Sequence, residues 1–398
     1  MENQQGGRQI AIDIFRAVTM LLMIFVNDLW SLKHIPRWLE HAGAEEDYMG
    51  LADIVFPCFL VIVGMSIPFA VERRIIAGDS KQKMIWHIVL RTISLLVMGV
   101  FIVNLDNYNE AYTGINRQWF QVLMVAAFFL IWNVYPVVSD KRRFIFLGLQ
   151  AAGVLILTIL AIRYRGDDGS GGITTISKQW WGILGLIGWA YGGSALIYLL
   201  CRKKWTLLFG AWLFFVIVNI LSHAGWLVEF LPSFLGNALI IGDGAFHAFA
   251  MSGVLATLII KKTFQHYRRI LIMLGVGVGL VLAGLFLNNY FVISKIKATP
   301  PWIFICTGIA YLLYAIIFYL AEVRGQYKWF KAIEIAGKNT LTCYLVPYFV
   351  YALAVFSGFS LPDSLVTGGI GILKSLAFSF LIIYITRLLN GLHIRLKL

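Results

Sequence analysis

Charged side chains are scarce in this sequence. Asp, Glu, Lys and Arg make up 13% of the 398 residues, whereas hydrophobic residues make up 60%. In a soluble domain about a quarter of the residues are charged. This composition therefore excludes an ordinary soluble globular protein and indicates an integral membrane protein. Cysteines are also few: Cys58, Cys201, Cys306 and Cys343 lie within apolar segments, and no C-x-x-C pair occurs. Neither a disulfide framework nor a zinc site is predicted.

Long polar stretches are missing as well. Every polar segment between the apolar runs is short, so we predict a single transmembrane domain over residues 1–398. The N-terminal segment MENQQGGRQ is polar and has no small-residue cleavage site, so no cleavable signal peptide is expected. The segment 163–179 is rich in Gly, Ser and Asp and is expected to have no regular structure.

The apolar runs are long enough to cross a bilayer, which takes about 20 residues in a helix. Hydrocarbon offers backbone polar groups no outside partner, so the spans are predicted to be helical. We predict an all-α polytopic bundle of about 12 transmembrane helices, within a range of about 10 to 12. After two spans within 12–68, the predicted spans are 88–104, one ending near 138, one ending before 163, 180–201, 205–222, 245–260, one containing the glycine run 275–279, 302–321, one after 338, and 368–388. The hairpin 180–223 is a candidate insertion.

The net charge of +13 is distributed in short basic clusters between the apolar runs. Lys and Arg gather in the C-terminal tail and in the loops 73–91, 140–143, 202–204, 261–269 and 324–338, whereas the alternate loops carry few. This alternation is typical of the positive-inside rule and predicts that both termini are cytoplasmic. The same placement argues against nucleic acid as a partner.

Polar side chains interrupt the first two spans. They are Asp13 and Arg16 at the start of the first span, Asn27 and Asp28 near its end, and Asp53 at the start of the second. Ionisable groups at membrane depth are costly and usually mark a functional site. The loop between the two spans contains His41, whose side chain type most readily exchanges a proton near neutral pH.

On the predicted topology the polar residues form two groups. The outer mouth holds Asn27, Asp28, His41, Asp53, Asp243 and His247, and the inner mouth holds Asp13, Arg16, Arg91, Lys338 and Asn339. Asp13 and Arg16 are three residues apart, so they share a helix face and can pair. Steps of three and four residues beyond that arginine reach Met20, Met23 and Asn27, which predicts a polar stripe along the first helix.

Each candidate also has a structural interpretation. A histidine at a membrane interface often has no chemical role, and Asp53 could simply cap its helix. The functional interpretation is that Asp53 orients the ring of His41, as an acid does in hydrolytic triads, and the two roles of the aspartate are compatible. Asp13 and Arg16 form either a neutralising pair or part of a phosphate site. The spacing of the histidines does not predict a metal site.

Three motifs in 11–68 stand out: IDIFRA with Asn27 after it, the histidine-bearing WLEHA, and LADIVFP followed by GMSIP. Together they resemble the heparan-α-glucosaminide N-acetyltransferase family and its bacterial relatives, whose pattern is D-x-x-R-G…N, a histidine loop and A-D-L-V-F-P-x-F. Ala17 stands where the family has Gly, and the histidine loop is slightly longer. Weaker similarity occurs near Arg91, at 297–302 and at 337–344.

The resemblance implies acetyl transfer from cytoplasmic acetyl-coenzyme A to an amino sugar of the terminal glucosamine class on the far side of the membrane. It implies that His41 is catalytic, either as general base or as nucleophile through an acetyl-imidazole. Asp53 and Asn27 are predicted to assist it. The predicted coenzyme ligands are Asp13, Arg16, Arg91, Lys338 and Asn339, and the predicted acceptor ligands are Asp28, Trp38, Asp243 and His247. No metal is predicted.

The expected location is a bacterial inner membrane, with the lipid bilayer as partner and a homodimer as a candidate assembly. A secondary transporter of amino sugars or other small solutes is the alternative, because many spans with polar residues inside them suit it equally well. Transporters of that build usually show broken helices in paired positions or an internal repeat. Here the polarity is concentrated in the first two spans, which favours the enzyme.

Overall fold

Helices form nearly all the regular structure in the computed structural model, which describes residues 10–136, 140–202, 204–226 and 243–398. Ten helices in these ranges are long and apolar enough to cross a membrane. They are α1 (Ile10–Asp28), α2 (Leu51–Ile76), α3 (Lys81–Val103), α6 (Asp140–Arg163), α7 (Gly182–Cys201), α8 (Trp205–His223), α11 (Ala245–Lys262), α12 (His266–Leu287), α13 (Pro300–Phe318) and α16 (Gly368–Gly391). The chain is an all-α polytopic membrane protein, and the predicted fold class is confirmed.

Two shorter apolar helices, α5 (Arg117–Trp132) and α15 (Thr340–Phe356), occupy the remaining two predicted spans. The short elements are α4 (Glu110–Thr113), α14 (Glu334–Lys338), η1 (Leu29–Ser31), η2 (Arg37–Leu39), η3 (Tyr319–Val323), η4 (Gln326–Phe330), η5 (Asp363–Leu365), β1 (Gly166–Asp167) and β2 (Ile173–Thr174). The two strands pair antiparallel, so the prediction of no regular structure at 163–179 was wrong for these residues. The turn between them closes because the Asp168 carboxylate accepts the backbone N–H groups of Ser170 and Gly172.

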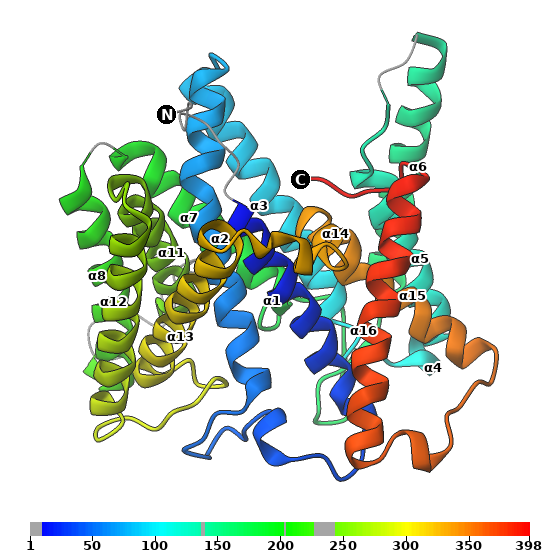
Figure 1. Ribbon diagram of the computed structural model, residues 1–398. Coiled ribbons are helices and arrows are strands. Elements are labelled where there is room, and N and C mark those ends of the chain that lie inside the picture. The colour runs from blue at the N-terminus through cyan, green and yellow to red at the C-terminus, as the bar shows by residue number, and fades with distance from the viewer. Residues whose placement is uncertain (1–9, 137–139, 203, 227–242) are drawn as a thin grey trace.

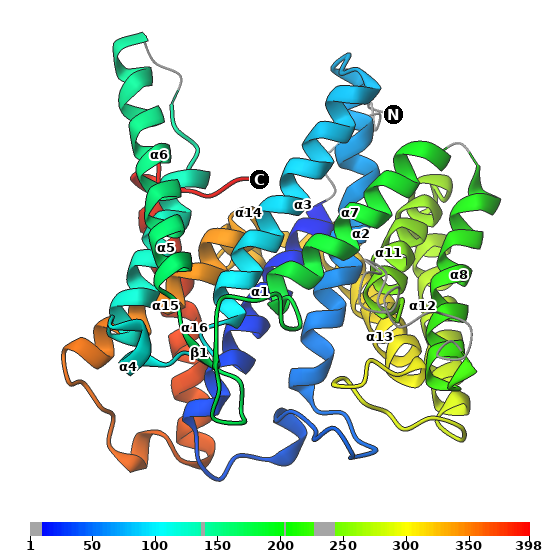
Figure 2. The same ribbon diagram turned by 180° about the vertical axis from the view of Figure 1, so that it is seen from behind.

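Helix α1 lies at the centre of the bundle (Figure 1). It contacts α2 and α13 on one side and α14, α15 and α16 on the other. The view from behind shows the same division, with α2, α8 and α11–α13 on one side of α1 and α5, α6, α15 and α16 on the other (Figure 2). The first helix therefore carries its polar residues along the boundary between two groups of helices.

Small residues let α2 and α11 approach very closely. A Cβ atom built at Gly64 would lie 1.8 Å from the carbonyl oxygen of Ala250, and one built at Gly253 would lie 2.0 Å from that of Val61. Close approach at such positions strengthens packing where water provides no hydrophobic driving force between helices. The pair α2–α11 is thereby fixed at the side of α1, and it carries Asp53 and His247 on its two helices.

The loops predicted to lie outside the membrane meet at one end of the molecule. The loop 29–50 after α1, the loop 288–299 after α12 and the segment 357–367 before α16 are at the lower end in Figure 1, and the turn between α2 and α3 is at the opposite end. An isolated β-bridge between Lys33 and Thr367 joins two of these loops. Residues far apart in the sequence are brought together there.

Candidate functional site

The start of α2 organises the candidate site. Asp53 is the third residue of this helix and is only 1% exposed. Its Oδ2 atom accepts the backbone N–H of Gly50 at 3.1 Å and that of Ala42 at 2.9 Å. The contact with Gly50 closes the helix N-terminus, where amides have no partner within the helix. The contact with Ala42 holds the loop 40–50 against the end of α2.

His41 lies against the other oxygen of the same carboxylate. Its Nδ1 atom is 2.7 Å from Asp53 Oδ1. Since the carboxylate already accepts two amide hydrogens, it acts as an acceptor here too, and Nδ1 carries the hydrogen. Nε2 then keeps a lone pair, and among the described residues it has no hydrogen-bond partner. Asp53 thus makes both the capping contact and the histidine contact, and the histidine is presented as a base whose tautomer a buried acid sets.

A third side chain, Lys295, completes the cluster and was not among the predicted site residues. Its Nζ atom is 3.0 Å from His41 Nδ1 and 3.7 Å from Asp53 Oδ1. Burial lowers the pKa of Lys295, and the neighbouring carboxylate partly opposes this shift. Nδ1 cannot donate to the carboxylate and accept from the ammonium at the same time, so Lys295 competes with Asp53 for this nitrogen. This lysine lies in the loop 288–299, 254 positions after His41 in the sequence.

His41 and Lys295 face a cavity of about 870 Å³, which we call the first cavity. Its wall is mostly apolar and aromatic, and the loop before α7 and the helices α1, α2, α7 and α11 contribute to it. The polar side chains in its lining are Asn27, His41, Lys178, Asp243, His247, Lys295 and Lys297. A large apolar cavity with a few convergent polar groups is the usual form of a ligand site. The structure thus brings four of the predicted site residues to one space: Asn27, His41, Asp243 and His247.

Two residues that line the first cavity, Trp189 and His247, each have a buried polar atom without a partner among the described residues. His247 is 3% exposed, its ring stacks on Phe215 with centroids 4.8 Å apart, and its Nδ1 atom has no hydrogen-bond partner within the described residues. The indole Nε1 of Trp189 is likewise buried and without a partner in that part of the chain. Both atoms are almost inaccessible, so a ligand in the first cavity could pair with them only if these side chains moved. Close by, Asp243 accepts the N–H of Ala245, and burial raises the pKa of its carboxyl.

A second cavity of about 570 Å³ adjoins the first. Asn27, Trp180 and Ile183 line both spaces, so the two cavities share a wall. Most other residues that line the second cavity belong to α1, to the C-terminal end of α3, to α5 and to α15. Asn27 therefore stands between the His41 cluster and a separate space on the other side of α1.

Two predicted acceptor ligands lie elsewhere. Asp28 is fully buried and accepts hydrogen bonds from Tyr351 at 2.8 Å, Lys374 at 2.8 Å and Ser375 at 2.5 Å. These contacts join the end of α1 to α15 and α16, so Asp28 occupies a structural position. Lys374 is a cation inside an apolar span, and such a residue signals a buried partner from sequence alone. Trp38 is 59% exposed in η2 and lines neither cavity.

The predicted coenzyme ligands line neither cavity. Arg16 pairs with Asp13 at 3.2 Å, as their spacing predicts, and also donates to Ser66 at 2.6 Å. Arg91 stacks on the Tyr191 ring with its guanidinium carbon 4.4 Å from the ring centroid, and its buried Nε has no partner among the described residues. Lys338 and Asn339 directly precede α15. Lys338 forms an ion pair with Glu334, and Asn339 donates to Asn390 at 2.9 Å. Asp13 and Arg16 lie together, while Arg91 belongs to a different pair of helices.

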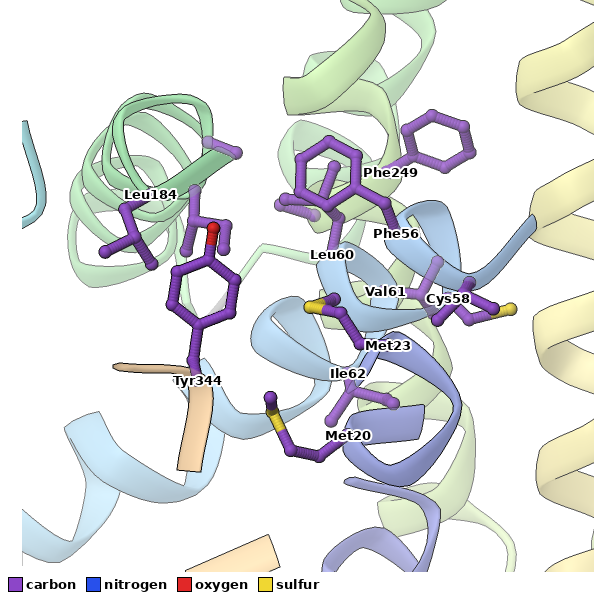
Figure 3. Close-up of a cluster of buried hydrophobic side chains, with 14 of the residues drawn as sticks. Met20, Met23, Phe56, Cys58, Leu60, Val61, Ile62, Leu184, Phe249 and Tyr344 are labelled. Carbon is purple, nitrogen blue, oxygen red and sulfur yellow. The ribbon is translucent and has the colours of Figure 1, made fainter. Parts of the chain in front are cut away.

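The predicted polar stripe along α1 is interrupted. Met20 is 1% exposed and Met23 is 4% exposed, and both belong to the buried core. They point from α1 toward the side where Leu184 and Tyr344 lie (Figure 3). We call these four side chains the apolar barrier. Its methionines lie between Arg16 and Asn27 along α1, so the stripe is apolar over the middle of the helix, although Met20, Met23 and Tyr344 also line the two cavities.

Comparisons with known proteins give a partial match. The chain is 36% identical over 107 residues to the heparan-alpha-glucosaminide N-acetyltransferase of Mus musculus and 33% identical over 102 residues to that of Homo sapiens. These regions cover 26% and 25% of this chain and only 15% and 14% of the two relatives. The chain thus spans about a seventh of the length of the curated relatives it matches. No family model matches it.

Proposed function

We propose that this protein is a membrane-embedded acetyltransferase that moves an acetyl group from acetyl-coenzyme A to the amine of an amino sugar. The partial similarity to two N-acetyltransferases supports an acetyltransferase-like function in general. The observation that carries the proposal is the His41–Asp53 pair, 2.7 Å apart, at the wall of the first cavity. A buried acid that fixes a histidine tautomer beside a ligand-sized space is the arrangement that acyl transfer requires.

The proposed chemistry uses the free Nε2 atom of His41. As general base, Nε2 removes a proton from the acceptor amine while the amine nitrogen bonds to the acetyl carbon and the carbon–sulfur bond breaks. As nucleophile, Nε2 bonds to the acetyl carbon first, releases the thiolate, and passes the acetyl group to the amine in a second step. In both routes the thiolate of the coenzyme finally takes the proton. Asp53 stabilises the positive ring in either case, because its carboxylate accepts from Nδ1.

The proposed sidedness places the coenzyme phosphates at the inner mouth. Asp13 and Arg16, Arg91, Lys338 and Asn339 are the proposed ligands there, and the acceptor meets Asp243 and His247 at the outer mouth. For the acetyl group to reach His41, the pantetheine arm must pass the apolar barrier. Three lysines, Lys178, Lys295 and Lys297, line the first cavity and offer a second set of cations for the phosphates. Oriented proteoliposomes separate the two arrangements: transfer from coenzyme on the basic-loop side to sugar on the opposite side supports the first, and transfer only from coenzyme on the sugar side refutes it.

The test of function is acetyl transfer from acetyl-coenzyme A to glucosamine by the purified protein. The variant His41→Ala is expected to lose two to four orders of magnitude in rate, about 3–5 kcal/mol in activation free energy. The matched control is His34→Ala, because His34 is in the same loop, is exposed and lines neither cavity. If His34→Ala is inactive and His41→Ala is active, the site assignment is wrong. A transporter would instead accumulate sugar in vesicles and would not bind acetyl-coenzyme A.

A further inference from the structure

The second cavity has no part in the chemistry described so far. We infer that it is the subsite for the sugar ring of the acceptor, a neutral or singly charged pyranose, whose amine extends into the first cavity. The inference rests on the proposed function and adds to it the place where the acceptor is recognised.

Position is the first argument. On α1, Met20, Ile24 and Asn27 lie on one helix face and line the second cavity, over a length of about 10 Å. Asn27 belongs to both cavities, as do Trp180 and Ile183. A ring held in the second cavity can therefore direct a substituent past Asn27 into the space that His41 faces.

The side chains of the lining are the second argument. Trp30, Tyr344, Tyr348 and Tyr351 contribute aromatic faces, and Trp30 packs against Tyr351 with ring centroids 6.0 Å apart. Aromatic faces suit the C–H surface of a pyranose, whereas hydroxyl groups need planar amides, carboxylates or guanidinium groups at the rim.

Those polar groups are present on α5 and in the loop that follows α3. Gln121 donates through Nε2 to the carbonyl of Tyr348 at 2.7 Å, which leaves its Oε1 atom as an acceptor. Arg117 donates to the Leu105 carbonyl at 3.0 Å with one of its five N–H groups. Asp106 lines the same space, and burial raises the pKa of its carboxyl while Arg117 opposes that shift.

Charge is the third argument. The first cavity is lined by three lysines and one aspartate, Asp243. The second cavity is lined by one arginine and one aspartate, Arg117 and Asp106. The opposite charges in the second cavity balance, so a ligand of little net charge is favoured there. The first cavity carries more cations, although Lys295 also faces Asp53 and Lys297 also faces Glu45.

The test compares Gln121→Leu with Gln150→Leu. Both glutamines are half-buried and donate through Nε2 to a backbone carbonyl, Gln150 to that of Ile131 at 3.1 Å, but Gln150 lines neither cavity. We expect Gln121→Leu to raise the KM for glucosamine about fivefold to tenfold and to leave the KM for acetyl-coenzyme A unchanged, because one hydrogen bond to the sugar is lost. Gln150→Leu should change neither. Trp30→Ala serves as a second variant, since Trp30 is 75% exposed and its removal does not disturb the core.

Equilibrium binding of glucosamine to the purified protein without coenzyme keeps this inference separable from the proposed function. Sugar binding that weakens in Gln121→Leu and Trp30→Ala, but not in Gln150→Leu, supports the subsite even if no acetyl transfer is found. Acetyl transfer with an unchanged glucosamine KM in both variants overturns the subsite and leaves the proposed function standing. A change in the KM for acetyl-coenzyme A alone also overturns it, because the donor would then occupy the second cavity.

Discussion

The substitution Asp53→Asn should invert the tautomer of His41 while leaving the fold in place. In the native protein Asp53 Oδ2 accepts two backbone N–H groups, and Oδ1 accepts from Nδ1 of His41. An asparagine must keep its oxygen toward the two amides, so its NH₂ group faces the ring and donates to Nδ1. The hydrogen of the ring then moves to Nε2, which becomes a donor and can no longer accept a proton or attack a carbonyl. The expected loss is two to four orders of magnitude in kcat, about 3–5 kcal/mol.

The effect on thermal stability should differ between Asp53→Asn and Asp53→Ala. Asp53→Asn keeps both amide contacts and should unfold close to the native temperature, whereas Asp53→Ala leaves two amides unpaired at about 1–3 kcal/mol each. Asp363→Asn is the control, because Asp363 is an exposed carboxylate that pairs with Lys33. The assays are acetyl transfer to glucosamine and thermal unfolding in detergent. If Asp53→Asn retains more than about a tenth of native kcat, the tautomer argument is refuted.

Three further predictions follow from other contacts. Lys295→Met should change the pH–rate profile, because it removes the cation 3.0 Å from His41 Nδ1 that competes with Asp53 for this nitrogen. Lys33→Met, which removes a cation of the exposed pair with Asp363, should leave the profile unchanged. Gly64→Ala should lower the free energy of unfolding by about 1–3 kcal/mol, because the new methyl group meets the backbone of Ala250. In Gly148→Ala on α6 the new methyl group meets no atom within 4 Å, so thermal unfolding should be unchanged. In a chain without native cysteines, a cysteine at Ser80 should resist an impermeant thiol reagent outside intact cells and one at Gly169 should react; the reverse result would invert the predicted topology.

Much of the fold could be predicted because hydropathy alone marks helices that must satisfy their own backbone in a bilayer. All twelve predicted spans coincide with apolar helices, although α5 and α15 are shorter than a full membrane span. The His41–Asp53 contact could also be foreseen, because both residues flank one short loop. Lys295 could not, since its approach to the pair depends on where α12 and α13 pack.

The errors along α1 have a different cause. Helical spacing correctly placed Arg16, Met20, Met23 and Asn27 on one face, but it cannot say which neighbours cover that face. The methionines are almost fully buried, with Met20 in the lining of the second cavity and Met23 in that of the first, whereas Asn27 lines both. Asp28, one residue further, turns toward Lys374 on α16. Adjacent positions on one helix therefore have different roles, which only the packing of the surrounding helices determines.

The apolar barrier has a consequence for the energetics of the membrane itself. A continuous polar route through a bilayer conducts protons and other ions, and each charge that crosses dissipates about 2.3 kcal/mol per 100 mV of membrane potential. Met20 and Met23 place two buried, unbranched side chains between Arg16 and Asn27 on α1, and such side chains adapt their shape to whatever lies beside them. Such side chains can deform around a slender substrate arm and close behind it without admitting a column of water. A transmembrane transfer of the proposed kind would then move a chemical group between two compartments while the ion gradient between them is kept.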